Sequence, residues 1–75
     1  MTSLQEQRKK RIQNLLRNIE TAWESGKEVD YYKILNYVAY EYGMSTRYVN
    51  EYLLILEHAG KIKIINNKIE RPDDK

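Results

Sequence analysis

The sequence predicts an α+β domain that is mainly helical, with three helices followed by a short two-stranded β-hairpin. Apolar residues recur at helical spacing through most of the chain, and a glycine follows each periodic run, at Gly26, Gly43 and Gly60. After the last glycine, the apolar period changes from about 3.6 to about 2 in the stretch KIKIINNKIE. The 75 residues suffice for one domain, which we expect to span residues 1–71, with a disordered tail at 72–75.

The first expected element is a long helix within residues 1–26. Ser3 is followed three residues later by Glu6, which is the spacing of a reciprocal capping box at a helix start. The apolar residues at helical spacing are Ile12, Leu15, Leu16, Ile19 and Trp23. The turns before them are polar and carry a basic cluster formed by Arg8, Lys9, Lys10 and Arg11. We therefore expect these turns to project beyond the core or to contact a partner.

Two further helices and the turn between them are expected over residues 31–59. Asp30 can cap the first of these helices, and Gly43 can end it. Its expected buried stripe is Tyr31, Ile34, Leu35, Val38, Ala39 and Tyr42. Ser45 can cap the next helix. The residues of that helix expected to face inward are Val49, Tyr52, Leu53, Leu56 and Ala59. Two helices separated by so short a break predict a helix-turn-helix.

The β-hairpin is expected over residues 61–71. The residues expected on its apolar face are Ile62, Ile64 and Ile69. On the other face, Lys63 and Glu70 can pair across the strands. Asn66 and Asn67 suit a tight two-residue turn because asparagine tolerates a positive φ.

The helix-turn-helix and the hairpin together resemble the winged helix-turn-helix family of DNA-binding domains. The resemblance rests on the spacing A-x-x-x-G-x-S-x-x-x-V-x-x-x-L, which is formed by Ala39, Gly43, Ser45, Val49 and Leu53. In that family a small residue lets the two helices approach, glycine makes the turn, serine caps the following helix, and the apolar pair locks it in place. The similarity covers roughly Val29 to Glu70. It implies a transcriptional regulator of the small prokaryotic or archaeal type that binds double-stranded DNA.

The resemblance also implies that the outward face of the helix over residues 46–59 reads base edges in the major groove. Arginine can donate two hydrogen bonds to guanine, asparagine can pair with adenine, a carboxylate can accept from cytosine, and an apolar group can contact the thymine methyl. The expected base-reading residues are Ser45, Thr46, Arg47, Asn50, Glu51 and Leu54. The expected contacts to the DNA backbone come from Tyr31, Tyr32, Lys61, Lys63, Lys68, Arg8, Lys9, Lys10 and Arg11.

We expect a homodimer, because one recognition helix reads only about four base pairs and two copies can read a palindromic site. The N-terminal helix is the expected dimer element, since it is longer than a three-helix core requires. Its apolar residues, with Leu4 added, offer more surface than one face of the helix can bury.

Two other functions remain open on the same residues. Winged helices also serve as protein–protein adaptors in polymerase, replication and membrane-remodelling assemblies, a role that exposed Tyr37, Tyr40 and Leu54 would suit. A non-specific chromosome-coating protein would bind through the basic residues, but the net charge of +2 gives this function little support. On the expected recognition helix, the charge of Arg47 is balanced by that of Glu51.

The sequence contains no recognisable catalytic constellation. It has no cysteine and one histidine, and it has neither a glycine-rich phosphate loop nor a nucleophile beside a base. We therefore expect no enzymatic activity, no metal and no cofactor. No apolar run approaches the roughly 18 residues of a membrane span, and no signal peptide is evident. We expect a soluble protein in the cytoplasm, associated with the nucleoid.

Overall fold

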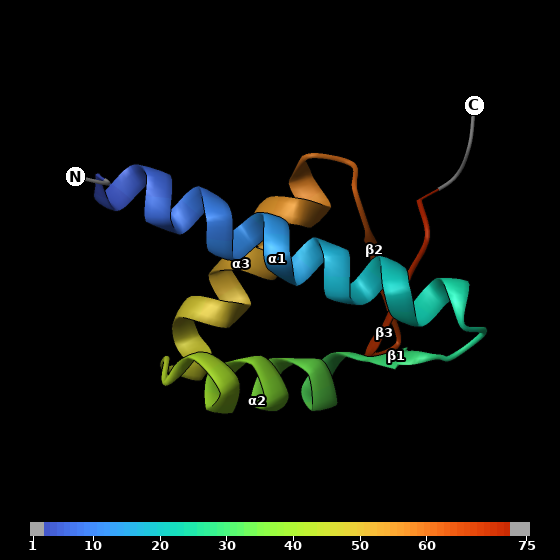
Figure 1. Cartoon of the computed structure of the whole chain (residues 1–75). Helices are drawn as coiled ribbons and strands as arrows, with labels where there is room; N and C mark the ends of the chain where they lie inside the picture. The colour runs from blue at the N-terminus through green and yellow to red at the C-terminus, as the bar shows by residue number, and fades with distance from the viewer. Residues whose placement is uncertain (1–2, 73–75) are drawn as a thin grey trace.

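Three helices pack around one hydrophobic core, and a short three-stranded antiparallel sheet lies beside the start of the second helix, in the computed structural model of residues 3–72 (Figure 1). The elements in chain order are α1 (Leu4–Glu24), β1 (Val29–Asp30), α2 (Tyr31–Tyr42), α3 (Thr46–His58), β2 (Lys63–Ile65) and β3 (Lys68–Glu70). The architecture is therefore α+β and mainly helical, as the sequence predicts.

Helix α1 begins with the predicted capping box. The Ser3 hydroxyl accepts from the backbone N–H of Glu6, and the Glu6 carboxylate accepts from the backbone N–H of Ser3, each at 3.1 Å. The helix ends at Glu24, where the following Gly26 has a φ of +77°. These local signals fix both ends of α1, and the expected helix within residues 1–26 is confirmed apart from residues 1–2, which lie outside the described residues.

The turn between α2 and α3 depends on one left-handed residue. Gly43 has φ +64° and ψ +35°, and the next backbone N–H, that of Met44, donates to the Ala39 carbonyl at 2.9 Å. This hydrogen bond closes the end of α2 in the manner typical of a glycine stop. Ser45 then caps α3, because its hydroxyl accepts from the backbone N–H of Arg47 at 3.1 Å. The predicted helix, turn and helix are all present.

The sheet has three strands where the sequence predicts two. Its order is β1-β3-β2, and all pairs are antiparallel. The extra strand arises because Val29 lies opposite Ile69, so the short connection before α2 completes the ladder of the hairpin. The predicted hairpin turn is confirmed, since Asn66 and Asn67 have φ values of +50° and +63°. The Asn67 carbonyl also accepts from the backbone N–H of Tyr31 at 2.8 Å, which joins the hairpin to the start of α2.

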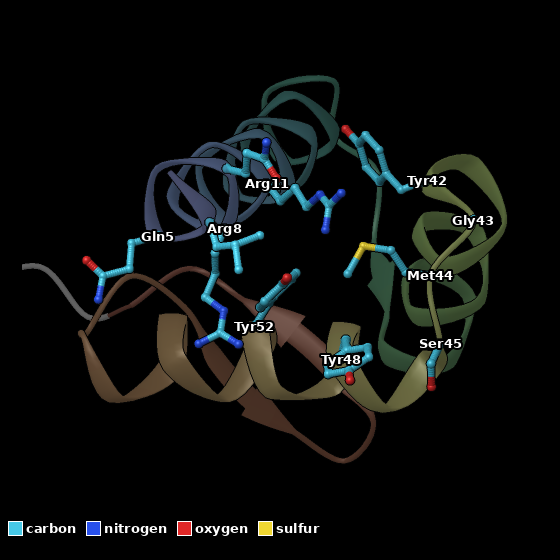
Figure 2. A pocket seen from close by; sticks show the side chains of 11 residues that line it. Gln5, Arg8, Arg11, Tyr42, Gly43, Met44, Ser45, Tyr48 and Tyr52 are labelled. Carbon is cyan, nitrogen blue, oxygen red and sulfur yellow. The ribbon is translucent and has the colours of Figure 1, made fainter. Parts of the chain in front are cut away.

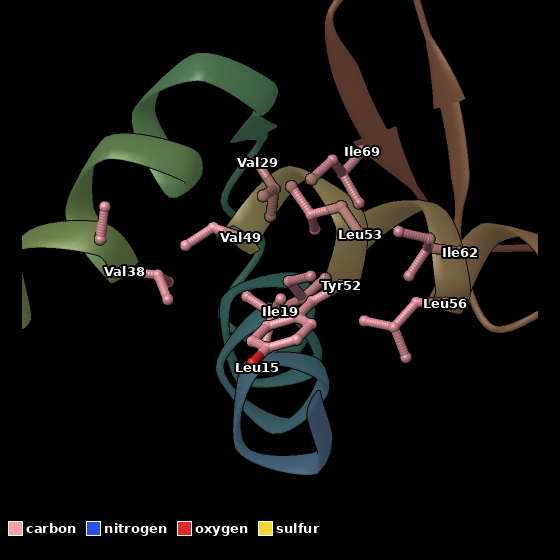
Figure 3. Close-up of a cluster of buried hydrophobic side chains, with 11 residues drawn as sticks. Leu15, Ile19, Val29, Val38, Val49, Tyr52, Leu53, Leu56, Ile62 and Ile69 are labelled. Carbon is pink, nitrogen blue, oxygen red and sulfur yellow. The ribbon is translucent and has the colours of Figure 1, made fainter. Parts of the chain in front are cut away.

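The core draws on every helix and on the sheet (Figure 3). Its buried residues are Leu15, Ile19, Val29, Val38, Ala39, Val49, Tyr52, Leu53, Leu56, Ile62 and Ile69. Trp23 lies at its edge, where the indole N–H donates to the Ile69 carbonyl at 3.1 Å. That hydrogen bond links the end of α1 to β3, two segments that lie far apart in the sequence.

Two residues predicted to face inward are exposed. Tyr42 lies on the inward stripe of α2 but remains 40% exposed, because it belongs to the last turn, where the space toward α1 is open. Ala59 is exposed because α3 ends at His58, one residue earlier than expected, and the chain then turns at Gly60. Ile62, only 1% exposed, contributes to the core after this turn.

Candidate functional site

The outward face of α3 is exposed along most of the helix. Arg47, Glu51, Leu54 and His58 are all exposed, and their spacing of four, three and four residues places them along one side of the helix. On the opposite side, the residues buried in the core are Val49, Tyr52, Leu53 and Leu56. Within residues 3–72, neither the Arg47 guanidinium nor the Glu51 carboxylate has a hydrogen-bond or ion-pair partner. With respect to the described residues, this face therefore presents an unpaired cation, an unpaired anion and an apolar side chain.

The predicted base-reading residues of α3 differ in how freely their side chains can reach a partner. Thr46, the first helical residue, is exposed, whereas the Ser45 hydroxyl is occupied by capping the helix. Asn50 is only partly exposed and lies seven residues before Glu57, on the same flank of α3. Glu57 is close enough to Tyr31 to affect its pKa, so this flank faces the start of α2. Of the six residues predicted to read bases, Ser45 and Asn50 are therefore the least available.

The two tyrosines predicted to contact DNA phosphates pack against each other at the start of α2. Their ring centroids are 5.3 Å apart and the rings meet edge to face at 88°. Tyr32 is 55% exposed, whereas Tyr31 is partly buried. Burial, followed by the neighbouring Tyr32 and Glu57, raises the pKa of the Tyr31 phenol above its ordinary value of 10.0. Like any tyrosine hydroxyl at neutral pH, it can donate a hydrogen bond.

The lysines of the hairpin differ in their surroundings. Lys61 is exposed and Lys63 is partly exposed, with Lys63 opposite Glu70 in the register of the strands, as predicted. The Lys68 ammonium donates to a carboxylate oxygen of Glu28 at 3.0 Å. This hydrogen bond and the charge of Glu28 raise the pKa of Lys68 above its ordinary value of 10.5. A phosphate at Lys68 would have to compete with that ion pair.

The basic cluster of α1 is divided between two directions. Arg8 and Arg11 line an open hollow of about 530 Å³, whereas Lys9 and Lys10 are exposed and do not line it. The residues that line this hollow, called the α1–turn hollow below, are Leu4, Gln5, Gln7, Arg8, Arg11, Tyr42, Gly43, Met44, Ser45, Tyr48 and Tyr52. Figure 2 shows α1 forming one wall and the α2–α3 turn with the start of α3 forming the other.

The aromatic lining of the α1–turn hollow was not predicted as a functional feature. Helical periodicity predicts Tyr42 and Tyr52 as core residues and indicates no role for Tyr48. One signal in the sequence was available: Arg8 and Arg11 precede Leu15 by seven and four residues, so all three share one helix face. An arginine pair on the core-facing side of a helix indicates a space that the core does not fill.

The surface of α2 carries two further exposed aromatic residues. Tyr37 is 55% exposed and Tyr40 is 84% exposed. Tyr37 and Tyr40 lie off the inward stripe of α2. Within residues 3–72, neither ring contacts another aromatic ring. They are therefore available to a partner.

No family model matches the chain, and neither a curated protein nor a solved structure gives a match. In the described part of the chain, no three or more histidine or acidic side chains are grouped as a metal would require. None of its helices is both long enough and apolar enough to cross a membrane. Function must therefore be inferred from the chemistry of the exposed surfaces.

Proposed function

We propose that the chain is a sequence-specific double-stranded-DNA-binding protein of the winged helix-turn-helix type, acting in transcriptional regulation. The observation that carries this proposal is the two-sided character of α3. Val49 and Leu53 are fully buried on one side, while Arg47 and Glu51 are exposed on the other and have no partner among residues 3–72. A helix held rigidly by its buried side and presenting mixed hydrogen-bonding groups on the other is suited to reading base edges.

The dimensions of α3 agree with this proposal. Its 13 residues correspond to roughly 20 Å of helix, and an α-helix fits the roughly 12 Å width of the DNA major groove. Arg47 would donate to guanine, Glu51 would accept from cytosine, and Leu54 would contact a thymine methyl. Thr46 and Asn50 lie beside them and would contribute at the edge of the contact.

Backbone contacts would come from side chains and not from the helix terminus of α2. The Asp30 carboxylate already accepts from the backbone N–H groups of Tyr32 and Lys33, at 3.0 and 3.1 Å. It therefore places a negative charge where a phosphate would otherwise bind. The exposed Tyr32 hydroxyl and Lys61 are better placed to donate to phosphate oxygens.

A homodimer remains part of the proposal, with a smaller contact surface than the sequence predicts. Leu15 and Ile19 are fully buried in the chain's own core, and Ile12, Leu16 and Trp23 pack against it. Only Leu4, 83% exposed, is left among the apolar residues of α1 that suggested the dimer. The dimer proposal therefore rests on the N-terminal end of α1 and on the need to read more than one half-site.

The test is selection of bound DNA from a random-sequence duplex pool at about 0.15 M salt. We expect an enriched palindrome whose binding weakens roughly 5- to 150-fold in Arg47→Ala, because one bidentate arginine contact contributes about 1–3 kcal/mol. Arg17→Ala is the matched control: it removes the same charge from the exposed side of α1 and should leave the selected site unchanged.

Three results of this selection would point elsewhere. Equal losses in Arg47→Ala and Arg17→Ala would mean that charge alone drives binding. A steep salt dependence without sequence preference would favour the chromosome-coating function, since counterion release dominates such binding. No binding by a folded protein would contradict DNA recognition altogether.

One observation favours the adaptor function as the second candidate. Tyr40 and Tyr37 expose aromatic surface on the outward side of α2, which is the kind of surface that protein interfaces use. If the chain is an adaptor, Tyr37→Ala combined with Tyr40→Ala should abolish capture of a partner while leaving the fold intact. The same double variant should not affect DNA selection through α3.

A further inference from the structure

The α1–turn hollow has the size of a small-molecule site. Its volume of about 530 Å³ lies within the roughly 300–1,000 Å³ typical of pockets that bind organic ligands. One wall is the N-terminal half of α1, and the other is the α2–α3 turn together with the first turns of α3 (Figure 2).

Two arginines project from α1 into this space. Arg8 and Arg11 share a helix face with Leu15, which is fully buried in the core, so they occupy positions that continue the core-facing stripe. In Figure 2, Arg11 extends between the walls toward Tyr42 and Met44, and Arg8 runs past Tyr52 toward α3. No acidic residue lines the hollow, and within residues 3–72 neither guanidinium has an ion-pair partner.

Tyr52 supplies an independent observation that a ligand belongs here. The residue is only 5% exposed, yet its hydroxyl makes no hydrogen bond within residues 3–72. Among the described residues, every fully buried side-chain nitrogen or oxygen has a hydrogen-bond partner. Because the Tyr52 hydroxyl has none, it is not fully buried and must reach solvent. Tyr52 lines the α1–turn hollow, so its hydroxyl reaches solvent there. A phenol held by the core and left unpaired at the wall can donate to a bound oxygen.

The remaining lining is apolar and aromatic. Tyr42 and Tyr48 are 40% and 50% exposed. Met44, which lies between them in the sequence, is partly buried. Aromatic faces and a thioether favour a flat apolar body, whereas paired guanidinium groups favour a carboxylate or phosphate, which they can bind through two parallel hydrogen bonds.

We propose that the α1–turn hollow binds a small organic anion composed of a flat apolar body and a carboxylate or phosphate group. Arg8 and Arg11 hold the anionic group, the Tyr52 hydroxyl donates to it, and Tyr42, Met44 and Tyr48 cover the apolar body. Because the ligand contacts both α1 and the α2–α3 turn, it links the two walls. If the proposed DNA recognition by α3 holds, the ligand acts as an effector that stabilises one orientation of α3.

The experiment uses the full chain without DNA, so that its result is separate from the proposed DNA recognition. The probes are 1-naphthoate, 1-naphthyl phosphate and the neutral 1-naphthamide, each titrated into ¹⁵N-labelled protein. We expect saturable shifts of the backbone amides of Met44, Ser45 and Tyr48 with at least one of the two anions. Binding of 1-naphthamide should be at least tenfold weaker, because it lacks the charge that the guanidinium groups recognise. Comparison of the two anions separates a carboxylate ligand from a phosphate ligand.

Variants locate the site. Arg8→Gln combined with Arg11→Gln should weaken the anion at least tenfold, and the fold should persist because both side chains are exposed. Tyr52→Phe keeps the ring in the core and should weaken the anions more than 1-naphthamide, because a hydrogen bond to a charged acceptor is stronger than one to an amide carbonyl. Arg17→Gln on α1 removes a charge outside the hollow and should bind like the unmodified chain.

Several outcomes would overturn the proposal. These are equal binding of the amide and the anions, shifts confined to residues outside the lining, or an unchanged affinity in the double arginine variant. Absence of binding by all three probes at millimolar concentration would also overturn it. The same holds if a second copy of the chain closes the hollow. That result would be seen as a doubled solution mass, with the backbone amides of Met44, Ser45 and Tyr48 protected before any probe is added.

Discussion

Replacing Gly43 by alanine isolates the conformational cost of the α2–α3 turn. Gly43 has a φ of +64°, and a Cβ atom added there meets no heavy atom within 4 Å, so steric clash does not contribute. An L-residue in this left-handed conformation costs about 1–2 kcal/mol. Part of that cost is offset, because alanine has less freedom than glycine in the unfolded chain by about 0.4–1 kcal/mol. We therefore expect Gly43→Ala to lower the free energy of unfolding by about 1 kcal/mol, or Tm by roughly 4–8 °C in a domain of this size.

The assay is urea denaturation followed by far-UV circular dichroism, with two companion variants. Gly43→Asn should lose less than Gly43→Ala, since asparagine tolerates a left-handed backbone. Gly60→Ala, where φ is +77° and the space is equally open, should lose about as much as Gly43→Ala. A loss above about 3 kcal/mol at Gly43 would mean that the side chain collides with a neighbour. No loss at all would mean that the turn does not need a positive φ, and either result would refute the reasoning.

Three further predictions concern the Trp23 hydrogen bond, the hairpin turn and the raised pKa values of Tyr31 and Lys68. Trp23→Phe removes the indole N–H that donates to the Ile69 carbonyl at 3.1 Å, and should lower stability by about 1–2 kcal/mol in urea denaturation. An unchanged midpoint would mean that water replaces the indole. Asn67→Gly should leave the hairpin intact and raise Tm slightly, because glycine adopts the φ of +63° without strain. A lower Tm would show that the asparagine side chain itself stabilises the turn. The pKa values of Tyr31 and Lys68 are both raised in the folded chain, so the folded state holds these protons more tightly than the unfolded state. Their contribution to stability is complete below about pH 10 and should be lost as the pH rises through the raised values. Tyr31→Phe should therefore flatten part of the decline in Tm above that pH, and an identical decline in both proteins would contradict the burial of the phenol.

Most of the helical part of the fold could be predicted because its signals are local. The capping box of Ser3 and Glu6 joins residues three positions apart, and the cap of α3 joins Ser45 to the N–H of Arg47, two positions away. Left-handed stops require only glycine at the right place, as at Gly43. The hairpin turn at Asn66 and Asn67 follows from the same kind of local preference.

The candidate site was predicted unevenly. Periodicity alone places Arg47, Glu51 and Leu54 outward on α3, and all three are exposed. The sequence grouped Arg8 and Arg11 with the neighbouring lysines as one basic patch, whereas the structure directs the two arginines into the α1–turn hollow. Charge runs give the number of cations in a segment but not the surface that each one meets, since successive helical residues point about 100° apart.

What the sequence by itself determined is the order of the elements, their ends, and the side of each helix that is apolar, since these depend on residues within about one or two turns of one another. Only the tertiary structure decided which residues far apart in the chain would meet. Glu28 pairs with Lys68 across 40 positions, and Trp23 bonds to Ile69 across 46. The third strand and the hollow between α1 and the turn belong to the same class. The long-range contacts, the third strand and the hollow all depend on how the helices and the sheet pack against one another. This packing results from the fit of all the core side chains together, so no local sequence pattern encodes it.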